Sequence, residues 1–148
     1  MPKFTLNLKA DLENLAELIP DEDTRWYLKF RCTHCNEETG KFVYVSKQEE
    51  VQHGRGKFNL LYRCSLCKRE HTVDVVSTLS YSSSGQYAPV AVFECRGLEP
   101  IEYDPRVGWT ARAESGRTFE CDLADDFADY DDDANEPVSV YSIESKFS

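Results

Sequence analysis

The 148-residue sequence has no apolar run near the roughly 20 residues that a membrane-spanning helix needs. Residues 1–5 show no basic region followed by an apolar stretch, so a secretory signal is not expected. Six cysteines without such a signal favour a reducing compartment, in which thiols bind metal instead of forming disulfides. We therefore expect a cytoplasmic protein, with the nucleus as a second location, and no membrane partner.

Histidine is scarce, with only His34, His53 and His71 in the chain. None belongs to an H-E-x-x-H or His-x-Glu pattern, which would build an open catalytic zinc site. His34 lies between two cysteines of one motif and is poorly placed to bind the same ion as both. All three histidines are expected on the surface, and no catalytic residue is predicted.

Positive charge is also in short supply. The chain has 17 Lys and Arg against 27 Asp and Glu, a formal net charge of −10. Nine acidic residues and no basic residue fall within residues 120–136, so the rest of the chain is close to neutral. Nucleic-acid binding depends on clustered Lys and Arg that displace counterions from phosphates. We therefore expect no nucleic-acid partner.

The acidic segment 120–136 has two interpretations. It is either a solvated loop or helix that keeps the protein soluble, or a docking surface for a basic protein. Phe119, Leu123, Phe127 and Tyr130 recur at a spacing of three or four residues, which would turn one apolar face toward the protein. The acidic residues, Asp131 among them, would then face water.

Two C-x-x-C motifs are the most informative feature that the sequence does contain. The first runs from Cys32 to Cys35 and the second from Cys64 to Cys67, with 28 residues between them. Two such pairs predict a four-thiolate site for one Zn²⁺ per chain, with Zn–S distances of about 2.3 Å. Four sulfurs close the tetrahedron and leave no position for substrate, so the motifs predict a structural metal and no enzymatic activity.

Thiol chemistry provides the alternatives. A redox C-x-x-C usually lies at a helix N-terminus, whose dipole lowers the thiol pKa, whereas both motifs here interrupt strand patterns. A thiol-dependent redox enzyme with a structural zinc would use Cys95 or Cys121 as its nucleophile. Arg96 is the adjacent cation, but on a strand it would point away from the face of Cys95. Buried core thiols are favoured, and the thiol enzyme is kept as the alternative.

Alternation of apolar and polar residues predicts strands along most of the chain. The predicted strands are residues 4–9, 26–31, 42–45, 58–62, 73–76, 90–95, 117–123 and 138–143. Each C-x-x-C falls at a turn between two strands, as in a zinc ribbon. Residues 10–19 instead have leucines at three-residue spacing, which predicts a helical turn or an irregular segment. The fold class predicted is all-β, with little helix.

The length fits one zinc-binding domain over residues 1–148. Residues 12–20 and 98–105 are similar to each other, and each follows a predicted strand. This similarity makes residues of about 1–80, with the metal site, and of about 88–148 candidates for two related β subdomains. The sequence does not indicate an oligomeric state.

Several stretches in combination resemble the eukaryotic CXXC-motif-containing zinc-binding protein family. They are the two C-x-x-C motifs and residues 25–29, 54–56, 93–100, 130–131 and 138–141. The resemblance implies a small protein of coiled sheets, with one zinc on Cys32, Cys35, Cys64 and Cys67, and no established enzymatic activity. We expect a protein-interaction or metal-homeostasis role, with a metallochaperone or a basic protein as partner.

Overall fold

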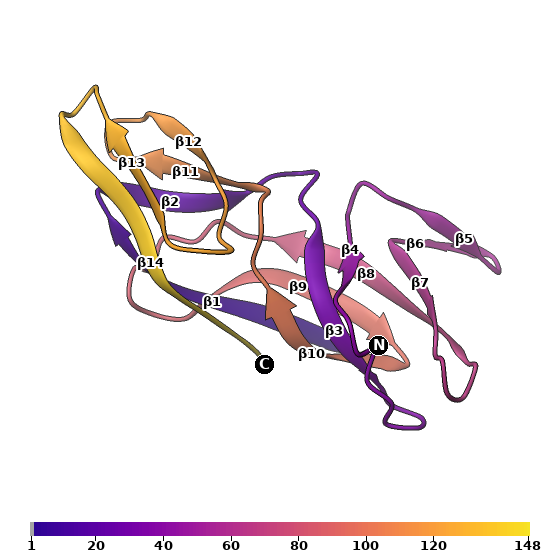
Figure 1. Cartoon of the computed structure of the whole chain (residues 1–148). Helices are drawn as coiled ribbons and strands as arrows, with labels where there is room; N and C mark the ends of the chain where they lie inside the picture. The colour runs from indigo at the N-terminus through magenta and orange to yellow at the C-terminus, as the bar shows by residue number, and fades with distance from the viewer. Residues whose placement is uncertain (1) are drawn as a thin grey trace.

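The computed structural model describes residues 2–148 and consists of strands joined by turns and loops (Figure 1). The strands are β1 (Lys3–Glu13), β2 (Leu15–Pro20), β3 (Trp26–Cys32), β4 (Val43–Val45), β5 (Val51–His53), β6 (Gly56–Phe58), β7 (Leu60–Arg63), β8 (Glu70–Thr78), β9 (Ala88–Arg96), β10 (Leu98–Asp104), β11 (Trp109–Ala113), β12 (Thr118–Cys121), β13 (Phe127–Asp131) and β14 (Glu136–Phe147). The predicted all-β class is confirmed. Within residues 2–148, no helix is long and apolar enough to span a membrane.

The strands form curled antiparallel sheets. The largest has the order β13-β14-β1-β9-β8-β7, and two three-stranded sheets have the orders β10-β3-β4 and β12-β11-β2. β5 and β6 form a separate hairpin. In the first half of β1, alternate residues such as Leu6 and Leu8 are fully buried, which is the pattern of a strand with one face on the core. Figure 1 shows β11 to β14 gathered at one end of the molecule and β5 to β7 at the other.

The core is centred on Trp26, where three sheets meet. Its ring lies 5.8 Å from Phe93 of β9, 5.8 Å from Tyr103 of β10 and 5.7 Å from Trp109 of β11, measured between centroids. The contacts with Phe93 and Trp109 are edge-to-face, a favoured geometry for aromatic pairs. This cluster ties β3, which leads into the first C-x-x-C motif, to strands from all three larger sheets.

The helical turn predicted over residues 10–19 is wrong. β1 continues to Glu13, the chain turns at Asn14, and β2 begins at Leu15. Asn14 has a φ of 58°, a left-handed conformation that asparagine tolerates better than most residues. The leucines at three-residue spacing therefore lie on two strands with different directions, and pairing with β14 and β11 determines their conformation.

Pro100 is a proline inside a strand. It lies within β10, opposite Phe30 of β3. Proline has no amide hydrogen to donate, but β10 is at the edge of its sheet, where a missing donor is tolerated.

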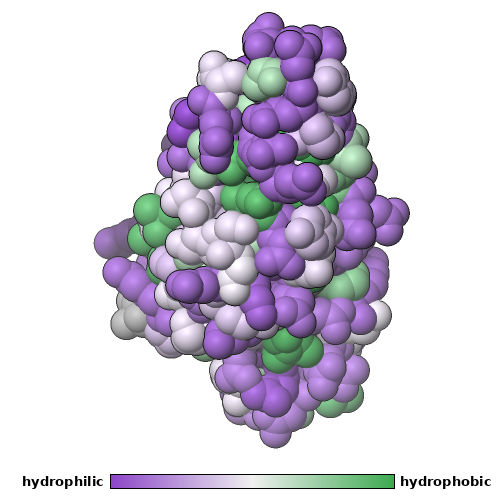
Figure 2. Space-filling model, turned by 90° about the vertical axis from the view of Figure 1, so that its left-hand side faces the viewer, coloured by the Kyte–Doolittle hydropathy of each residue, from purple (hydrophilic) through white to green (hydrophobic). Residues whose placement is uncertain are grey.

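The acidic segment 120–136 is neither a loop nor a helix, because it includes β13 and the ends of two other strands. Phe119 and Leu123 are buried as expected, whereas Tyr130 is 46% exposed because it lies on the outer face of β13. Most of the acidic residues are exposed. Seen from this end, the surface is mainly hydrophilic (Figure 2).

Asp131 is the exception among these acidic residues, since its side chain is fully buried. Its carboxylate accepts hydrogen bonds from the Ser115 hydroxyl at 2.5 Å and from the amides of Asp133 and Ala134 at 3.0 and 3.4 Å. The Ser115 hydrogen bond is the main cause that lowers the pKa of Asp131. The expectation that this residue faces water is therefore wrong: it anchors the turn between β13 and β14.

Candidate metal centre

Two turns of the same backbone geometry present the four cysteines of the C-x-x-C motifs. The amide of Asn36 donates to the carbonyl of Cys32 at 2.8 Å, and the amide of Lys68 donates to the carbonyl of Cys64 at 3.0 Å. Asn36 and Lys68 are both left-handed, with φ of 65° and 64°. The first turn follows β3 and the second follows β7, so the two pairs come from strands of different sheets.

The four sulfurs converge on one point. All of them lie within 4.8 Å of one another. The Sγ atoms of Cys32 and Cys67 are 3.8 Å apart, and those of Cys35 and Cys64 are 3.5 Å apart. A tetrahedral zinc with Zn–S distances of about 2.3 Å would place its sulfurs about 3.8 Å apart. The cluster therefore has the dimensions to hold one tetrahedral metal ion.

Backbone amides of the turns also donate to the sulfurs. The amide of Cys67, together with that of Leu66, lowers the pKa of the Cys64 thiol to about 7. The amide of Glu37 acts in the same direction on Cys35, but desolvation and the three neighbouring sulfurs outweigh it and raise the pKa of Cys35 to about 12. Four sulfurs this close cannot all be thiolates unless a cation lies between them. A divalent ion would supply that charge.

The two cysteines of each motif differ in exposure. Cys32 and Cys64, the first of each pair, are 1% and 2% exposed. Cys35 and Cys67, the second of each pair, are only half-buried. The cluster thus has an inner pair of sulfurs directed toward the body of the protein and an outer pair closer to solvent.

His71 is not the surface residue that we expected. It lies on β8, is 5% exposed, and places Nε2 3.2 Å from the Sγ of Cys32. Burial, and next the charges of Arg69 and His34, lower the pKa of the His71 imidazole. The sequence could not reveal this contact, because the contact depends on how β8 and β3 approach each other around the corner between β9 and β10.

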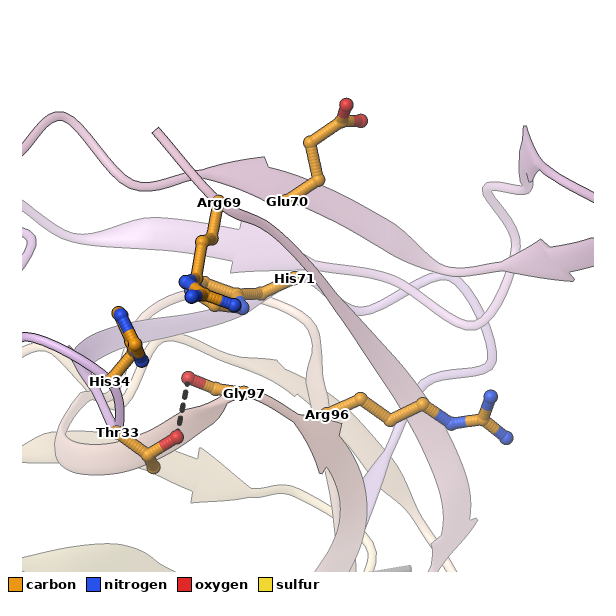
Figure 3. A pocket seen from close by; sticks show the side chains of 7 residues that line it. All are labelled: Thr33, His34, Arg69, Glu70, His71, Arg96 and Gly97. Carbon is orange, nitrogen blue, oxygen red and sulfur yellow. Dashed lines mark hydrogen bonds between the residues drawn. The ribbon is translucent and has the colours of Figure 1, made fainter. Parts of the chain in front are cut away.

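A cavity of 610 Å³ lies beside the first C-x-x-C motif (Figure 3). Its lining residues are Thr33, His34, Arg69, Glu70, His71, Arg96 and Gly97. In Figure 3 the Arg69 and His34 side chains are directed toward the His71 ring, while Glu70 and Arg96 point away. The Thr33 hydroxyl donates to the carbonyl of Gly97 at 3.1 Å. The first motif is thereby attached to the corner between β9 and β10.

Cys95 and Cys121, the candidate nucleophiles of the alternative function, lie in the hydrophobic core. They are 0% and 3% exposed. Burial raises the pKa of each thiol to about 12, so both are protonated near neutral pH. Arg96 is exposed and lies next to Cys95 on β9, where successive side chains point to opposite faces.

The curled sheets and the sulfur cluster together define an all-β protein with four clustered cysteines that could hold a metal ion. The chain belongs to the family described as CXXC motif containing zinc binding protein, eukaryotic, whose model matches residues 5–148. A Xenopus laevis protein of the same description is 40% identical over 157 aligned residues, which cover 99% of this chain and 98% of the relative. A human protein of that description is 37% identical with the same coverage.

A solved structure entitled "Crystal Structure of C1orf123" has the same fold. It superposes with a TM-score of 0.93 at 37% sequence identity, and the match covers 99% of both chains. The family resemblance predicted from the sequence motifs is therefore confirmed over almost the whole chain.

Proposed function

We propose that this is a non-enzymatic protein in which Cys32, Cys35, Cys64 and Cys67 hold one structural Zn²⁺ per chain. The convergence of four sulfurs from two matching turns is the observation that carries the proposal. The description of the family supports zinc as the metal. Bound zinc would supply four coordinate bonds that cross-link the turn after β3 to the turn after β7.

The two turns belong to different sheets, so a metal bound between them would link one sheet to the other. β7 is an edge strand of the six-stranded sheet, and β3 belongs to a separate three-stranded sheet. Between the two motifs, β4, β5 and β6 have only three residues each. Strands of three residues bury little apolar surface, so a metal on the four cysteines would add a direct link between these two turns.

Zinc content of matched cysteine variants tests the assignment of the ligands. Cys35→Ser and Cys64→Ser should lose the metal, because three thiolates and a hydroxyl bind zinc much more weakly than four thiolates. Cys95→Ser, which changes a core thiol, is the control and should keep a full complement of zinc. Full zinc occupancy in Cys64→Ser would contradict the proposed ligand set.

We further propose that the protein acts by binding another protein in the cytoplasm, in an interaction or metal-homeostasis role. The exposed acidic residues of 120–136 suit a basic partner, and the half-buried sulfurs of Cys35 and Cys67 suit exchange with a metallochaperone. Six free cysteines fit a reducing compartment. Affinity capture from native cells, with zinc-loaded protein as bait, would identify the partner by mass spectrometry.

The thiol-enzyme alternative has no supporting geometry, because its two candidate nucleophiles are buried and protonated. Labelling of the zinc-loaded protein with a thiol reagent at neutral pH provides the test. Cys95 and Cys121 should react only on the timescale of unfolding. Rapid labelling of either one in the folded protein would favour the enzyme.

A further inference from the structure

A buried imidazole lies against one sulfur of the metal centre without joining the set of ligands. Nε2 of His71 is 3.2 Å from the Sγ of Cys32. The donor atoms that all lie within 4.8 Å of one another belong to the four cysteines alone. His71 therefore contacts a ligand sulfur from outside the tetrahedron.

The chemistry of the pair fixes the direction of this hydrogen bond. A zinc-bound cysteine is a thiolate with no proton to donate, so the hydrogen must be on Nε2. We propose that His71 is a positioning residue of the metal centre, whose Nε2–H donates to the Cys32 thiolate and makes Cys32 a more firmly held ligand than the half-buried Cys35 and Cys67. This inference rests on the proposed zinc-binding role of the cysteines.

The corner between β9 and β10 holds the imidazole in place. Gly97 forms this corner with a φ of 85°, and a Cβ there would lie 2.1 Å from Nδ1 of His71. Only glycine leaves room for the ring. The carbonyl of Gly97 also accepts from the amide and the hydroxyl of Thr33, at 3.0 and 3.1 Å. One corner thus fixes both the imidazole and the turn that begins at Cys32.

The contact between His71 and Cys32 makes the four cysteine sulfurs unequal in how firmly they would hold the metal. Cys32 is 1% exposed and has a side-chain donor, whereas Cys35 and Cys67 are half-buried. Groups that orient a ligand and hydrogen-bond to it typically change metal affinity by about 10- to 100-fold. Loss of zinc should therefore begin at Cys35 or Cys67, and Cys32 should be among the last sulfurs to react with an external reagent.

Zinc release to an excess of chelator tests the role of His71. His71→Phe keeps a ring of similar size and removes the donor, so release should be about 10- to 100-fold faster than in the wild-type protein. His71→Gln keeps an N–H group and should recover part of the loss. His53→Phe changes a histidine of the β5–β6 hairpin, which does not line this cavity, and should release zinc at the wild-type rate.

A pair of glycine variants separates the loss of the contact from backbone strain. Gly97→Ala should speed release because its Cβ displaces the imidazole. Gly116→Ala is the matched control, since Gly116 has a similar φ of 96° but no atom within 4 Å of an added Cβ. Equal zinc-release rates in these two variants would contradict the role of Gly97 in leaving room for the His71 imidazole.

Two measurements on the wild-type protein keep the inference testable if the variants fold poorly. Nitrogen-15 NMR should show the Nε2–H tautomer of His71, and zinc X-ray absorption should show four sulfur ligands. An Nδ1–H tautomer, a nitrogen ligand, or wild-type release from folded His71→Phe would each overturn the inference. Wild-type protein that carries no zinc would overturn the proposed function as well, so the two failures are distinguishable.

Discussion

Asp131, Asp132 and Asp133 follow one another in the sequence but differ completely in environment. Asp131 is fully buried and accepts three hydrogen bonds, whereas the other two are exposed. Local composition identified the acidic segment but could not show which carboxylate turns inward, because that depends on Ser115 in a distant turn. The sequence likewise could not show that His71 is buried against Cys32, because that contact depends on how β8 and β3 approach each other. The four clustered cysteines were predictable because their spacing is itself the signal.

Asp131→Asn should lower the melting temperature at pH 7, and Asp133→Asn should leave it nearly unchanged. Asparagine keeps the volume of the side chain but loses the charge that favours three hydrogen bonds. The folded-state pKa of Asp131 is lowered, so its stabilising contribution is complete above the ordinary aspartate pKa of about 3.9 and is lost as pH falls through the lowered value.

Thermal melts of both variants from pH 7 to pH 2 check this prediction. The gap between wild type and Asp131→Asn should shrink in the acidic range. A gap that stays constant down to pH 2 would show that the charge of Asp131 contributes nothing.

At the scale of single elements, strand patterns predicted where most strands lie, and long-range pairing decided the rest. Residues 10–19 have a helical leucine spacing but become the end of β1 and most of β2, because β14 and β11 supply partners for their backbone groups. β13 was missed because alternation is absent from its sequence: three of its five residues are exposed, and the inward group is a carboxylate. Tertiary pairing overrides weak local preference in both cases.

Trp26→Ala should be among the most destabilising changes on β3. Removal of a fully packed Trp leaves a cavity where three sheets meet, and such changes typically cost about 3–5 kcal/mol. Trp26→Phe should retain much of the aromatic contact and lose less. Urea unfolding curves give both values, and a change below about 1 kcal/mol for Trp26→Ala would contradict the described core.

Asp132→Asn combined with Asp133→Asn should weaken capture of a basic partner, more at low salt than at high salt, because exposed charges are screened. The melting temperature and zinc content should hardly change, since both residues are exposed and the Arg117 pair of Asp132 lies on the surface. Glu22→Gln with Asp23→Asn removes the same charge elsewhere and is the control. Undiminished capture at every salt concentration would return the segment to a solubility role.

At the scale of the whole molecule, the half that carries the four cysteines and the end that carries the acidic segment 120–136 differ in the sign of their charge. Residues 25–72, which contain both C-x-x-C motifs, have ten Lys and Arg against five Asp and Glu, whereas the rest of the chain is strongly acidic. Figure 1 places β5 to β7 far from β12 and β13. The net charge alone could not reveal this separation, because it averages over the fold. β1, from the start of the chain, pairs with both β9 and β14, so the six-stranded sheet joins the two halves of the chain.

Removal of zinc should unfold at least the part of the molecule around the two cysteine turns, from β3 to β7. Structural four-thiolate sites have apparent zinc-binding free energies of about 10–16 kcal/mol, as large as the stability of a whole domain. Free thiols titrate near pH 8.5, whereas zinc keeps its ligands deprotonated far below that value. The zinc-dependent stability should therefore fall as pH decreases from 7 to 5, because protons compete for sulfur. Melts with and without chelator check this, and an unchanged melt of the metal-free protein would rule out a structural role.

Native mass spectrometry of the purified chain tests the central claim most directly, because it counts the ions held by each folded molecule. We predict one species whose mass exceeds that of the chain by one zinc less the displaced protons, and Cys64→Ser should lack it. A wild-type chain that retains no zinc, or that holds more than one tightly bound ion, would contradict the account.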